Sequence, residues 1–315
     1  MEGDYLTKVQ SDFHPGFPLN HRNKVIHTTL KQFEKYEPDS GLSMKFCLDG
    51  KEHYRMNGSQ HEVTSGKFLL VNRRRDLHCW IDSEKAVEGI CYYVDEEIVK
   101  DVIQTMNRNI DSSLVSPFHR MDSAGGEFRE IVLTARRSLL GNFLADSAIV
   151  IRRDSSIPGG SDFFYRLAEI LVAENHRISA QVNGIEAEKK STREELFRRV
   201  TKAREWIEDC QLSQVTISEL ARECCLSEYH LHRTFRQVFG ISPHQYLISC
   251  RIETAKILLQ KENLRVLDVA HQTGFSDIHT FSKTFRKKTG VAPGKWRNSF
   301  ADLAGKDKPN REAQA

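Results

Sequence analysis

The segments TFRQVFGISP (residues 234–243) and TFRKKTGVAP (residues 284–293) are two copies of one pattern, 50 residues apart. Both copies open with Thr-Phe-Arg, place Gly at the seventh position and end on Pro. Upstream, residues 220–227 match residues 269–276 at an offset of 49, so one residue has been added between Ser276 and Phe281. Internal similarity of this kind indicates that one supersecondary unit occurs twice.

Each copy is predicted to fold as a helix, a tight turn and a second helix. Thr216 and Glu219 have the spacing of a capping box, which satisfies free backbone donors at a helix start. Ser227 is a good N-cap for the next helix. The second copy is expected to turn at Gly274 and to be capped by Ser276. The apolar residues that recur at helical spacing are Ile217, Leu220, Ala221, Cys224, Leu231, Phe235, Val238, Phe239, Phe281 and Phe285.

The opposite face of each second helix carries hydrogen-bond donors. Such a face suits the major groove, where guanine edges offer acceptors, and lysines beside it suit phosphates. A solvated helix surface can have the same composition, but two equivalent faces that each follow a short turn favour DNA binding. The predicted DNA-binding residues are Ser227, Tyr229, His232, Arg233, Arg236, Ser276, His279, Thr280, Ser282, Lys283, Arg286 and Lys287.

Residues 243–261 are predicted to form one unbroken helix between the two copies. Nineteen residues at ~1.5 Å each span ~28 Å. This length is close to the ~34 Å between major-groove segments on one face of B-DNA. A rigid spacer of this length would let one chain place two reading helices in successive grooves.

Composition limits the class of protein. The chain has 315 residues, enough for two domains, and no stretch reaches the ~18 apolar residues of a membrane helix. Residues 1–10 lack the apolar core of a secretion signal, so we expect a cytoplasmic protein. Seven cysteines without CxxC spacing favour reduced thiols. Residues 193–300 hold 18 Lys and Arg against 12 Asp and Glu, whereas the rest holds 28 against 31, so the basic part suits a polyanion.

The N-terminal part has a different pattern. Residues 24–94 contain short runs of alternating hydrophobicity separated by turn residues, as in a β-sandwich or barrel. Helical spacing predicts helices over 127–140 and 163–173, with a loop at 155–161 between them. A polar, charged linker is expected at 179–192, and a polar, disordered tail at 301–315.

Residues 216–297 resemble the DNA-binding domain of AraC/XylS-type transcription regulators. The resemblance implies seven helices, with two helix-turn-helix units joined by the long helix. It also implies that Tyr229, His232, Arg233, His279, Ser282 and Lys283 occupy base-facing positions. Trp296 stands where the family more often has Tyr. The residues that carry the resemblance are Val269-Ala270, Gly274-Phe275-Ser276-Asp277, Phe281-Ser282-Lys283, Phe285-Arg286-Lys287, Gly290, Pro293 and Trp296-Arg297.

The N-terminal region is loosely similar to the family's effector domain, a cupin-like β-barrel followed by dimerisation helices. The chain is therefore expected to be an α+β multidomain protein, and to act with double-stranded DNA, RNA polymerase, a small-molecule effector and a second copy of itself. An activator role rests on the resemblance alone. The expected parts are a cupin-like effector domain (1–122), a helical dimerisation region (123–178), the linker (179–192), the AraC-type DNA-binding domain with two helix-turn-helix units (193–300) and the tail (301–315). The candidate effector-binding residues are Lys45, Tyr54, His78, Trp80 and Tyr92.

Two other functions stay open at this point. Cys225 beside Cys224 in the first turn would allow a redox-responsive regulator if its thiolate is favoured. A metal-dependent cupin enzyme would need three or four converging ligands. His53, His61, His78 and Glu62 lie in the β region, but there is no His-x-His pair. No nucleophile elbow or phosphate loop is present, so we expect no enzyme activity, no metal and no cofactor.

Overall fold

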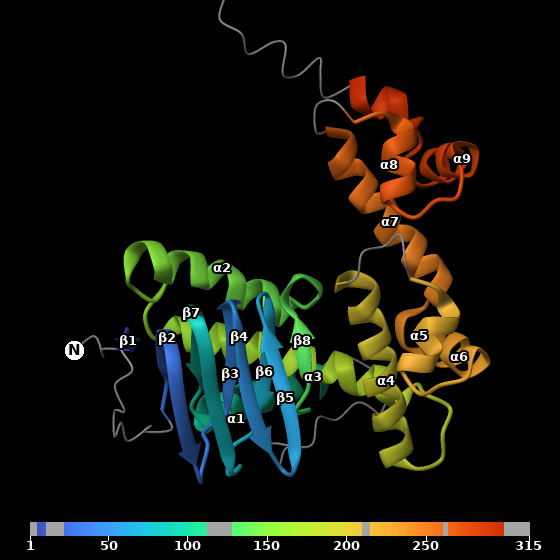
Figure 1. Cartoon of the computed structure of the whole chain (residues 1–315). Coiled ribbons are helices and arrows are strands. Elements are labelled where there is room, and N and C mark those ends of the chain that lie inside the picture. Colours follow the sequence, from blue (N-terminus) through green and yellow to red (C-terminus); the bar gives the residue numbers. More distant parts are fainter. Residues whose placement is uncertain (1–4, 11–21, 112–127, 210–214, 261–263, 299–315) are drawn as a thin grey trace, which may run out of the picture. The chain divides into compact units, whose positions relative to one another are not determined.

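The computed structural model describes residues 5–10, 22–111, 128–209, 215–260 and 264–298. Contacts divide the chain into two compact units, Met1–Ser179 and Ala180–Ala315. The first unit combines a β-sheet with helices, and the second is helical (Figure 1). The expected boundary between 122 and 123 and the expected tail at 301–315 lie outside the described residues.

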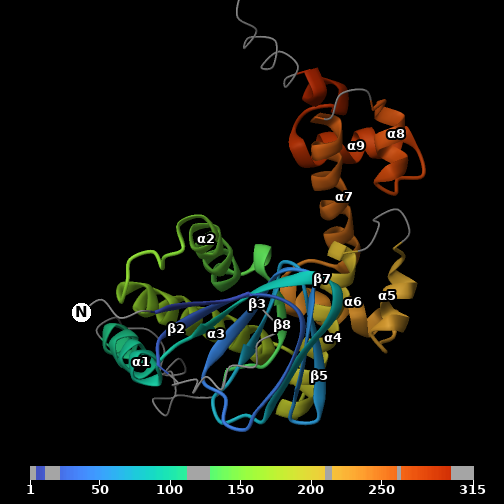
Figure 2. The same cartoon turned by 60° about the vertical axis from the view of Figure 1, so that its left-hand side comes forward.

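Within the described residues, eight strands form one curved sheet in the first unit (Figures 1 and 2). The strand order is β1-β2-β7-β3-β6-β8, and β4 pairs with both β5 and β7. The long strand β7 pairs with β4 near its beginning and with β3 near its end, so it joins two parts of the curved sheet. The strands are β1 Leu6–Val9, β2 Lys24–Glu37, β3 Ser43–Asp49, β4 Lys51–Met56, β5 Ser59–Thr64, β6 Lys67–Val71, β7 Leu77–Tyr93 and β8 Val132–Thr134.

Alternating burial explains why the N-terminal sequence forms strands. Along β4, Glu52, Tyr54 and Met56 are buried, whereas the residues between them are more exposed. Successive strand side chains point to opposite faces, so this period of two lines one face of the sheet with core residues. Tyr54 and Met56 pack there in a cluster with Leu77 and Ile81. The prediction of a β region over residues 24–94 is confirmed.

Three helices of the first unit follow the main strands. They are α1 Glu96–Asp111, which was not predicted, α2 Leu139–Asp154 and α3 Asp162–Asn183. The helix predicted for 163–173 lies within α3, and 155–161 lies between α2 and α3 as expected. The helix predicted for 127–140 is wrong. Residue 127 is outside the described residues, β8 and a 3-10 helix at Ala135–Arg137 occupy most of the range, and α2 begins only at Leu139.

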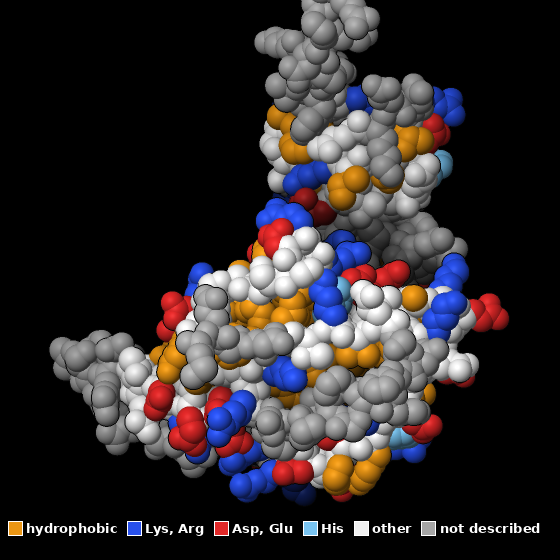
Figure 3. Space-filling view, turned by 90° about the vertical axis from the view of Figure 1, so that its left-hand side faces the viewer, with side chains coloured by type: hydrophobic (Ala, Val, Ile, Leu, Met, Phe, Trp, Pro, Cys, Tyr) orange, Lys and Arg blue, Asp and Glu red, His pale blue; other side chains and the backbone are white. Residues whose placement is uncertain are grey.

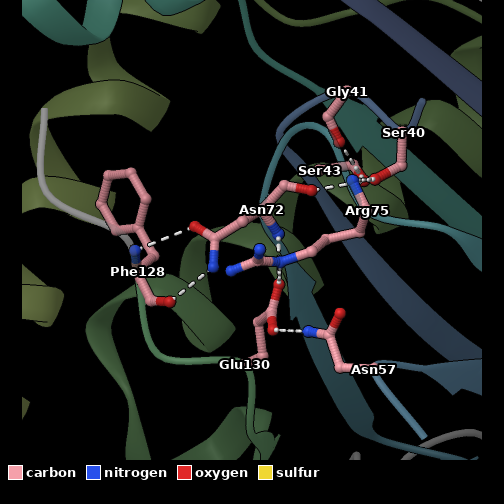
Figure 4. A network of polar contacts seen from close by, with 8 residues as sticks. All are labelled: Ser40, Gly41, Ser43, Asn57, Asn72, Arg75, Phe128 and Glu130. Atoms are coloured by element: carbon pink, nitrogen blue, oxygen red, sulfur yellow. Dashed lines mark hydrogen bonds and ion pairs between the residues drawn. The ribbon is translucent and has the colours of Figure 1, made fainter.

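A polar network explains why the segment before β8 is extended (Figure 4). Asn72 Nδ2 donates to Phe128 O over 2.7 Å, and Phe128 N donates to Asn72 Oδ1 over 2.9 Å. Arg75 Nε and Asn57 Nδ2 donate to the two carboxylate oxygens of Glu130, over 2.7 and 3.1 Å. The next residues then pair with β6, so bonds to distant strands override the helical spacing of the local sequence.

Most of the expected linker at 179–192 is helical, although the division between the two units falls at its start, after Ser179. Helix α3 continues to Asn183, and α4 (Lys190–Asp209) begins at Lys190, so only residues 184–189 lie outside a helix. The polar composition of the stretch hid a short apolar stripe. Ile178 and Val182 are buried one helical turn apart, and Ile185 is buried directly after the helix.

The second unit is built from a repeated three-helix arrangement. Helix α4 contacts α5 and α6, and α7 contacts α8 and α9. The buried residues Val200, Ala203 and Ile207 of α4 correspond to Ile252, Ala255 and Leu259 of α7. The duplication therefore includes a supporting helix as well as each helix pair. The remaining bounds are α5 Ile217–Glu223, α6 Glu228–Phe239, α7 Pro243–Gln260, α8 Val266–Gln272 and α9 Ile278–Thr289, and a further helix is described over 293–298.

The helix caps match the prediction at three of four residues. Thr216 and Glu219 form the capping box of α5, and Ser227 caps α6 by accepting from His230 N. The cap predicted at Ser276 is wrong, because Asp277 caps α9. The added residue was expected between Ser276 and Phe281, but it lies in the turn before Asp277, because the caps of α6 and α9 are already 50 residues apart.

We expect Gly274→Ala to lower the free energy of unfolding by about 1 kcal/mol, because a Cβ is costly in the left-handed region. Gly274 has φ +81°, and Cys225 takes the same turn position in the first copy with φ +52°. Cys225→Ala is the matched control and should change stability little, since that position already carries a Cβ. Urea unfolding followed by circular dichroism measures both. Equal losses in the two variants would contradict this account.

Candidate nucleic-acid interface

Buried side chains fix the rotation of α6 and α9. Phe235, Phe281 and Phe285 are fully buried, and Leu231 lies beside Phe235 in the core of the first helix pair. Because a helix repeats every 3.6 residues, anchoring these positions turns the opposite face of each helix outward. The structure therefore places the predicted donor faces at the surface.

The outward faces contain most of the predicted DNA-binding residues. Tyr229 has 69% of its surface exposed although it is a large aromatic residue. Neither face contributes an acidic side chain at the predicted positions. On α6 the exposed residues are Tyr229, His232, Arg233 and Arg236, and on α9 they are His279, Thr280, Lys283, Arg286 and Lys287, with Ser282 half-buried.

The two predicted serine contacts have local roles. Ser227 Oγ accepts from His230 N over 3.2 Å, which satisfies a free donor at the start of α6. Ser276 Oγ donates to Asp277 Oδ2 over 3.3 Å, and Asp277 in turn accepts from Thr280 N over 2.7 Å. Both serines are exposed, and both stand at the N-terminal ends of the candidate reading helices.

A shallow basic hollow lies beside α9. Lys283, Arg286 and Lys287 line it together with Ser282, Gly290 and Ala292. Three cations without an acidic neighbour in the lining attract an anion, and the flat, open form of the hollow suits a phosphate on an extended backbone.

Helix α7 supplies the spacing between the two pairs. It contacts α6 at one end and α8 and α9 at the other, as Figures 1 and 2 show. Its 18 residues correspond to about 27 Å at 1.5 Å per residue. The observed helix ends one residue earlier than the predicted range 243–261.

One contact on α6 was not predicted. Arg233 forms an ion pair with Glu186, which lies between α3 and α4. Both side chains are largely exposed. The two residues are 47 positions apart, so no local sequence pattern could have paired them. The guanidinium that was expected to face a base is therefore paired with a carboxylate.

The predicted effector residues fall into two groups. Lys45, Tyr54 and Trp80 line a cavity within the curved sheet of the first unit. His78 and Tyr92 do not line it. His78 stacks on Trp80 and pairs with Glu34 near the surface. Tyr92 is fully buried against α2, where its hydroxyl contacts Leu144 O and Ser147 Oγ.

Strand alternation accounts for the position of Tyr92. Its neighbours on β7, Cys91 and Tyr93, line the cavity, while Tyr92 points to the opposite face. Glu37 and His53 also line this cavity, and neither was among the candidate effector-binding residues.

A metal site and a reactive cysteine are the alternatives to DNA binding. In the described part of the chain, no three or more His, Cys, Asp or Glu side chains are placed to hold a metal ion. Cys225 is exposed, whereas Cys224 is buried, and burial raises the pKa of the Cys224 thiol. None of the described helices combines the length and the apolar character that crossing a membrane requires.

A known protein family matches part of the second unit. Residues 220–299 match the family described as a helix-turn-helix domain. The bifunctional transcriptional activator/DNA repair enzyme AdaA of Bacillus subtilis (strain 168) is 34% identical over 93 residues, which are 30% of this chain and 44% of AdaA. The HTH-type transcriptional activator RhaS of Escherichia coli O139:H28 (strain E24377A / ETEC) is 35% identical over 88 residues, which are 28% of this chain and 32% of RhaS.

The matched regions are short relative to the relatives. This chain spans less than half the length of AdaA or of RhaS. Among solved structures, the DNA-binding domain of AdpA in complex with a target DNA is 25% identical, with 34% of this chain and 96% of that chain covered and a TM-score of 0.32.

The cap of α9 should make stability depend on pH. Hydrogen bonds from the Thr280 backbone and side chain hold the pKa of Asp277 below its usual 3.8. A lowered pKa in the folded state adds stability above pH ~4, and this contribution is lost as the pH falls through the lowered value. Asp277→Asn keeps a good cap that does not titrate.

We therefore expect the wild type to gain stability relative to Asp277→Asn between pH 3 and pH 6. Thermal unfolding of both proteins across this range measures the difference. Asp101→Asn, an exposed acidic change in the first unit, controls for general loss of charge. A difference that is constant with pH would show that the Asp277 carboxylate does not carry the effect.

Proposed function

Because the C-terminal unit carries an AraC-type helix-turn-helix domain, we propose that this protein is a sequence-specific, DNA-binding transcription regulator. The observation that carries the proposal is the pair of outward, donor-rich faces on α6 and α9. In this proposal α5–α6 and α8–α9 are two helix-turn-helix units, and α6 and α9 are their reading helices. Helix α7 holds them about one duplex turn apart.

Affinity and specificity come from different residues. The cations beside α9, Lys283, Arg286 and Lys287, neutralise phosphates and make binding salt-dependent. Exposed donors near the start of each reading helix then contact base edges in the major groove. On α6 these are Tyr229, His232 and Arg233, and on α9 they include His279.

The direction of regulation is proposed from the relatives. AdaA and RhaS are both named transcriptional activators, and the match to them covers the DNA-binding region. We propose that this protein also activates transcription, with RNA polymerase as a partner. Activity at DNA places it in the cytoplasm.

The first unit is proposed to be a cupin-like effector domain over residues 1–122, followed by a dimerisation region over 123–178. The cavity that contains Lys45 and Tyr54 supports an effector site. Leu139 and Ile149 of α2 have 66% and 63% of their surfaces exposed, which supports pairing through this region. Figure 3 shows the hydrophobic and charged side chains on one face of the molecule. An effector changes DNA binding only if it binds one arrangement of the protein more tightly than another.

Selection of bound DNA from a random-sequence pool tests the proposal. We expect the full chain to enrich one site with two recognition elements about 10 base pairs apart. A variant with Lys283→Ala and Arg286→Ala is the control and should enrich it weakly. Recovery of DNA without a shared sequence would overturn sequence-specific binding.

Arg233→Ala should relax the preference at one base pair by about tenfold, because a bidentate Arg–guanine contact is lost. Lys287→Ala is the matched control. It should weaken all sites alike and reduce the slope of log affinity against log salt by about 1. Fluorescence anisotropy on the selected site and its single-base variants, at two salt concentrations, separates the two effects. If Arg233→Ala weakened binding to all sites equally, Arg233 would not be a base-reading residue.

Glu186→Gln should raise affinity for the selected site about two- to fivefold, because DNA no longer has to displace an exposed ion pair from Arg233. Glu188→Gln removes the same charge from the same segment without that ion pair and should have a smaller effect. The same anisotropy titration measures both. Equal gains would assign the effect to net charge and contradict a specific role of Glu186.

A further inference from the structure

The cavity of the first unit has buried charged side chains among its largely apolar walls. Lys45, Glu37 and Glu52 line it, and each is at least 93% buried. Burying a charge is costly unless the charge is paired. The hydrogen-bonding state of these three groups therefore indicates what the cavity binds. The inference below rests on the proposed function, because it takes this cavity as the effector site.

Lys45 has hydrogen-bond donors that the protein does not use. Its Nζ donates to Tyr93 Oη over 2.6 Å, and none of the ion pairs in the described part of the chain includes it. A lysine ammonium has three donors. Burial by itself lowers the pKa of Lys45, but the Glu37 carboxylate and the hydrogen bond to Tyr93 oppose this effect, and the pKa stays above its usual value.

Glu37 has a hydrogen-bond acceptor that the protein does not use. Its Oε1 is buried and has no hydrogen-bond partner in the structure. Glu37 lies at the end of β2 and lines the same cavity as Lys45. A buried acceptor without a partner costs free energy in the empty protein, and a ligand that donates to it would recover that cost.

One carboxylate oxygen of Glu52 has a hydrogen-bond partner within the protein. Tyr54 Oη donates to Glu52 Oε2 over 2.6 Å, and burial raises the pKa of this carboxyl group. Gly89 leaves room for it, since a Cβ there would stand 2.1 Å from Glu52 Oε1. The groups that remain to bind a ligand are the ammonium of Lys45, Glu37 Oε1 and His53 Nδ1, the last of which is also buried without a partner. The first two are oppositely charged and can bind the two ends of one hydroxyl group.

Charge balance then selects the ligand. Two lysines (Lys35 and Lys45) and two glutamates (Glu37 and Glu52) line the cavity. Their formal charges already balance, so a carboxylate ligand would add an uncompensated negative charge beside Glu37. A neutral hydroxyl is better suited, because its oxygen accepts while its hydrogen donates. Aromatic side chains of Phe33, Tyr54, Trp80 and Tyr93 line the cavity and favour an aromatic ring.

We propose that the cavity binds a small, uncharged phenol whose hydroxyl accepts from Lys45 Nζ and donates to Glu37 Oε1. The ring packs against the aromatic wall. Binding is non-covalent, because the two cysteines of the cavity remain thiols. Burial raises the pKa of Cys79 to about 12 and that of Cys91 to about 11.

Three probes that share one ring test the proposal on the full chain without DNA. They are p-cresol, 4-methylanisole, which lacks the donor, and 4-methylbenzoate, which is an anion. Calorimetric titration should show that p-cresol binds at least tenfold more tightly than either of the others, and p-cresol should raise the melting temperature. Equal or tighter binding of 4-methylbenzoate, similar affinity for all three probes, or no binding of p-cresol would overturn it.

A variant in which Glu37 is replaced by a neutral residue gives a second readout. Glu37→Gln should weaken p-cresol about tenfold and narrow or reverse the preference over 4-methylbenzoate, because the repelling carboxylate is gone. Glu34→Gln is the matched control on the same strand. Its side chain is exposed and pairs with His78 instead of lining the cavity, so it should change neither affinity. An unaltered preference in folded Glu37→Gln would overturn the role of Glu37.

The ligand and the function can fail separately. If p-cresol binds with the expected preference but does not alter DNA affinity, the ligand assignment stands and effector control by this cavity falls. If the random-pool selection yields a specific site but p-cresol does not bind, the proposed regulator stands and the ligand assignment falls.

Discussion

Burial of three phenylalanine rings is the constraint on which the candidate interface depends. Phe235 in α6 and Phe281 and Phe285 in α9 are fully enclosed, and each ring contributes on the order of 2 kcal/mol when it leaves water. A helix with a fixed inner face has no freedom in its outer one. The orientation of Arg233 and Lys283 therefore follows from residues that contact no ligand.

The repeat shows how a helix pair tolerates an added residue. The second copy is one residue longer than the first, and the extra residue lies in the turn before Asp277, outside both helices. Helix α9 begins at its own cap, so the extra residue does not change which of its side chains are buried. Added inside α9, one residue would have rotated every later side chain by about 100°. Turns accept length changes because their backbone is not tied to a helical period.

Strand β7 connects the cavity of the first unit to α2. Tyr93 faces the cavity and bonds to Lys45, while the adjacent Tyr92 lies on the opposite face of the strand, buried against α2, and bonds to Leu144 and Ser147. A ligand that shifts Tyr93 would act on the same two-residue segment that holds α2. The hydrogen bond between Lys45 and Tyr93 in the cavity is thus one residue away from the contact between Tyr92 and α2.

The sequence by itself determined the duplicated helix pairs and the faces they expose, because those features repeat every 3.6 residues or sit at a cap, and each needs only a few neighbouring residues. Only the tertiary structure decided that 128–134 is extended and not helical, since its hydrogen bonds go to strands far away in the chain. It also decided which of Tyr92 and Tyr93 faces the cavity, because a shift of one residue reverses every side chain of a strand. The pairing of Glu186 with Arg233 joins residues 47 positions apart, and only the folded chain brings two such charges together.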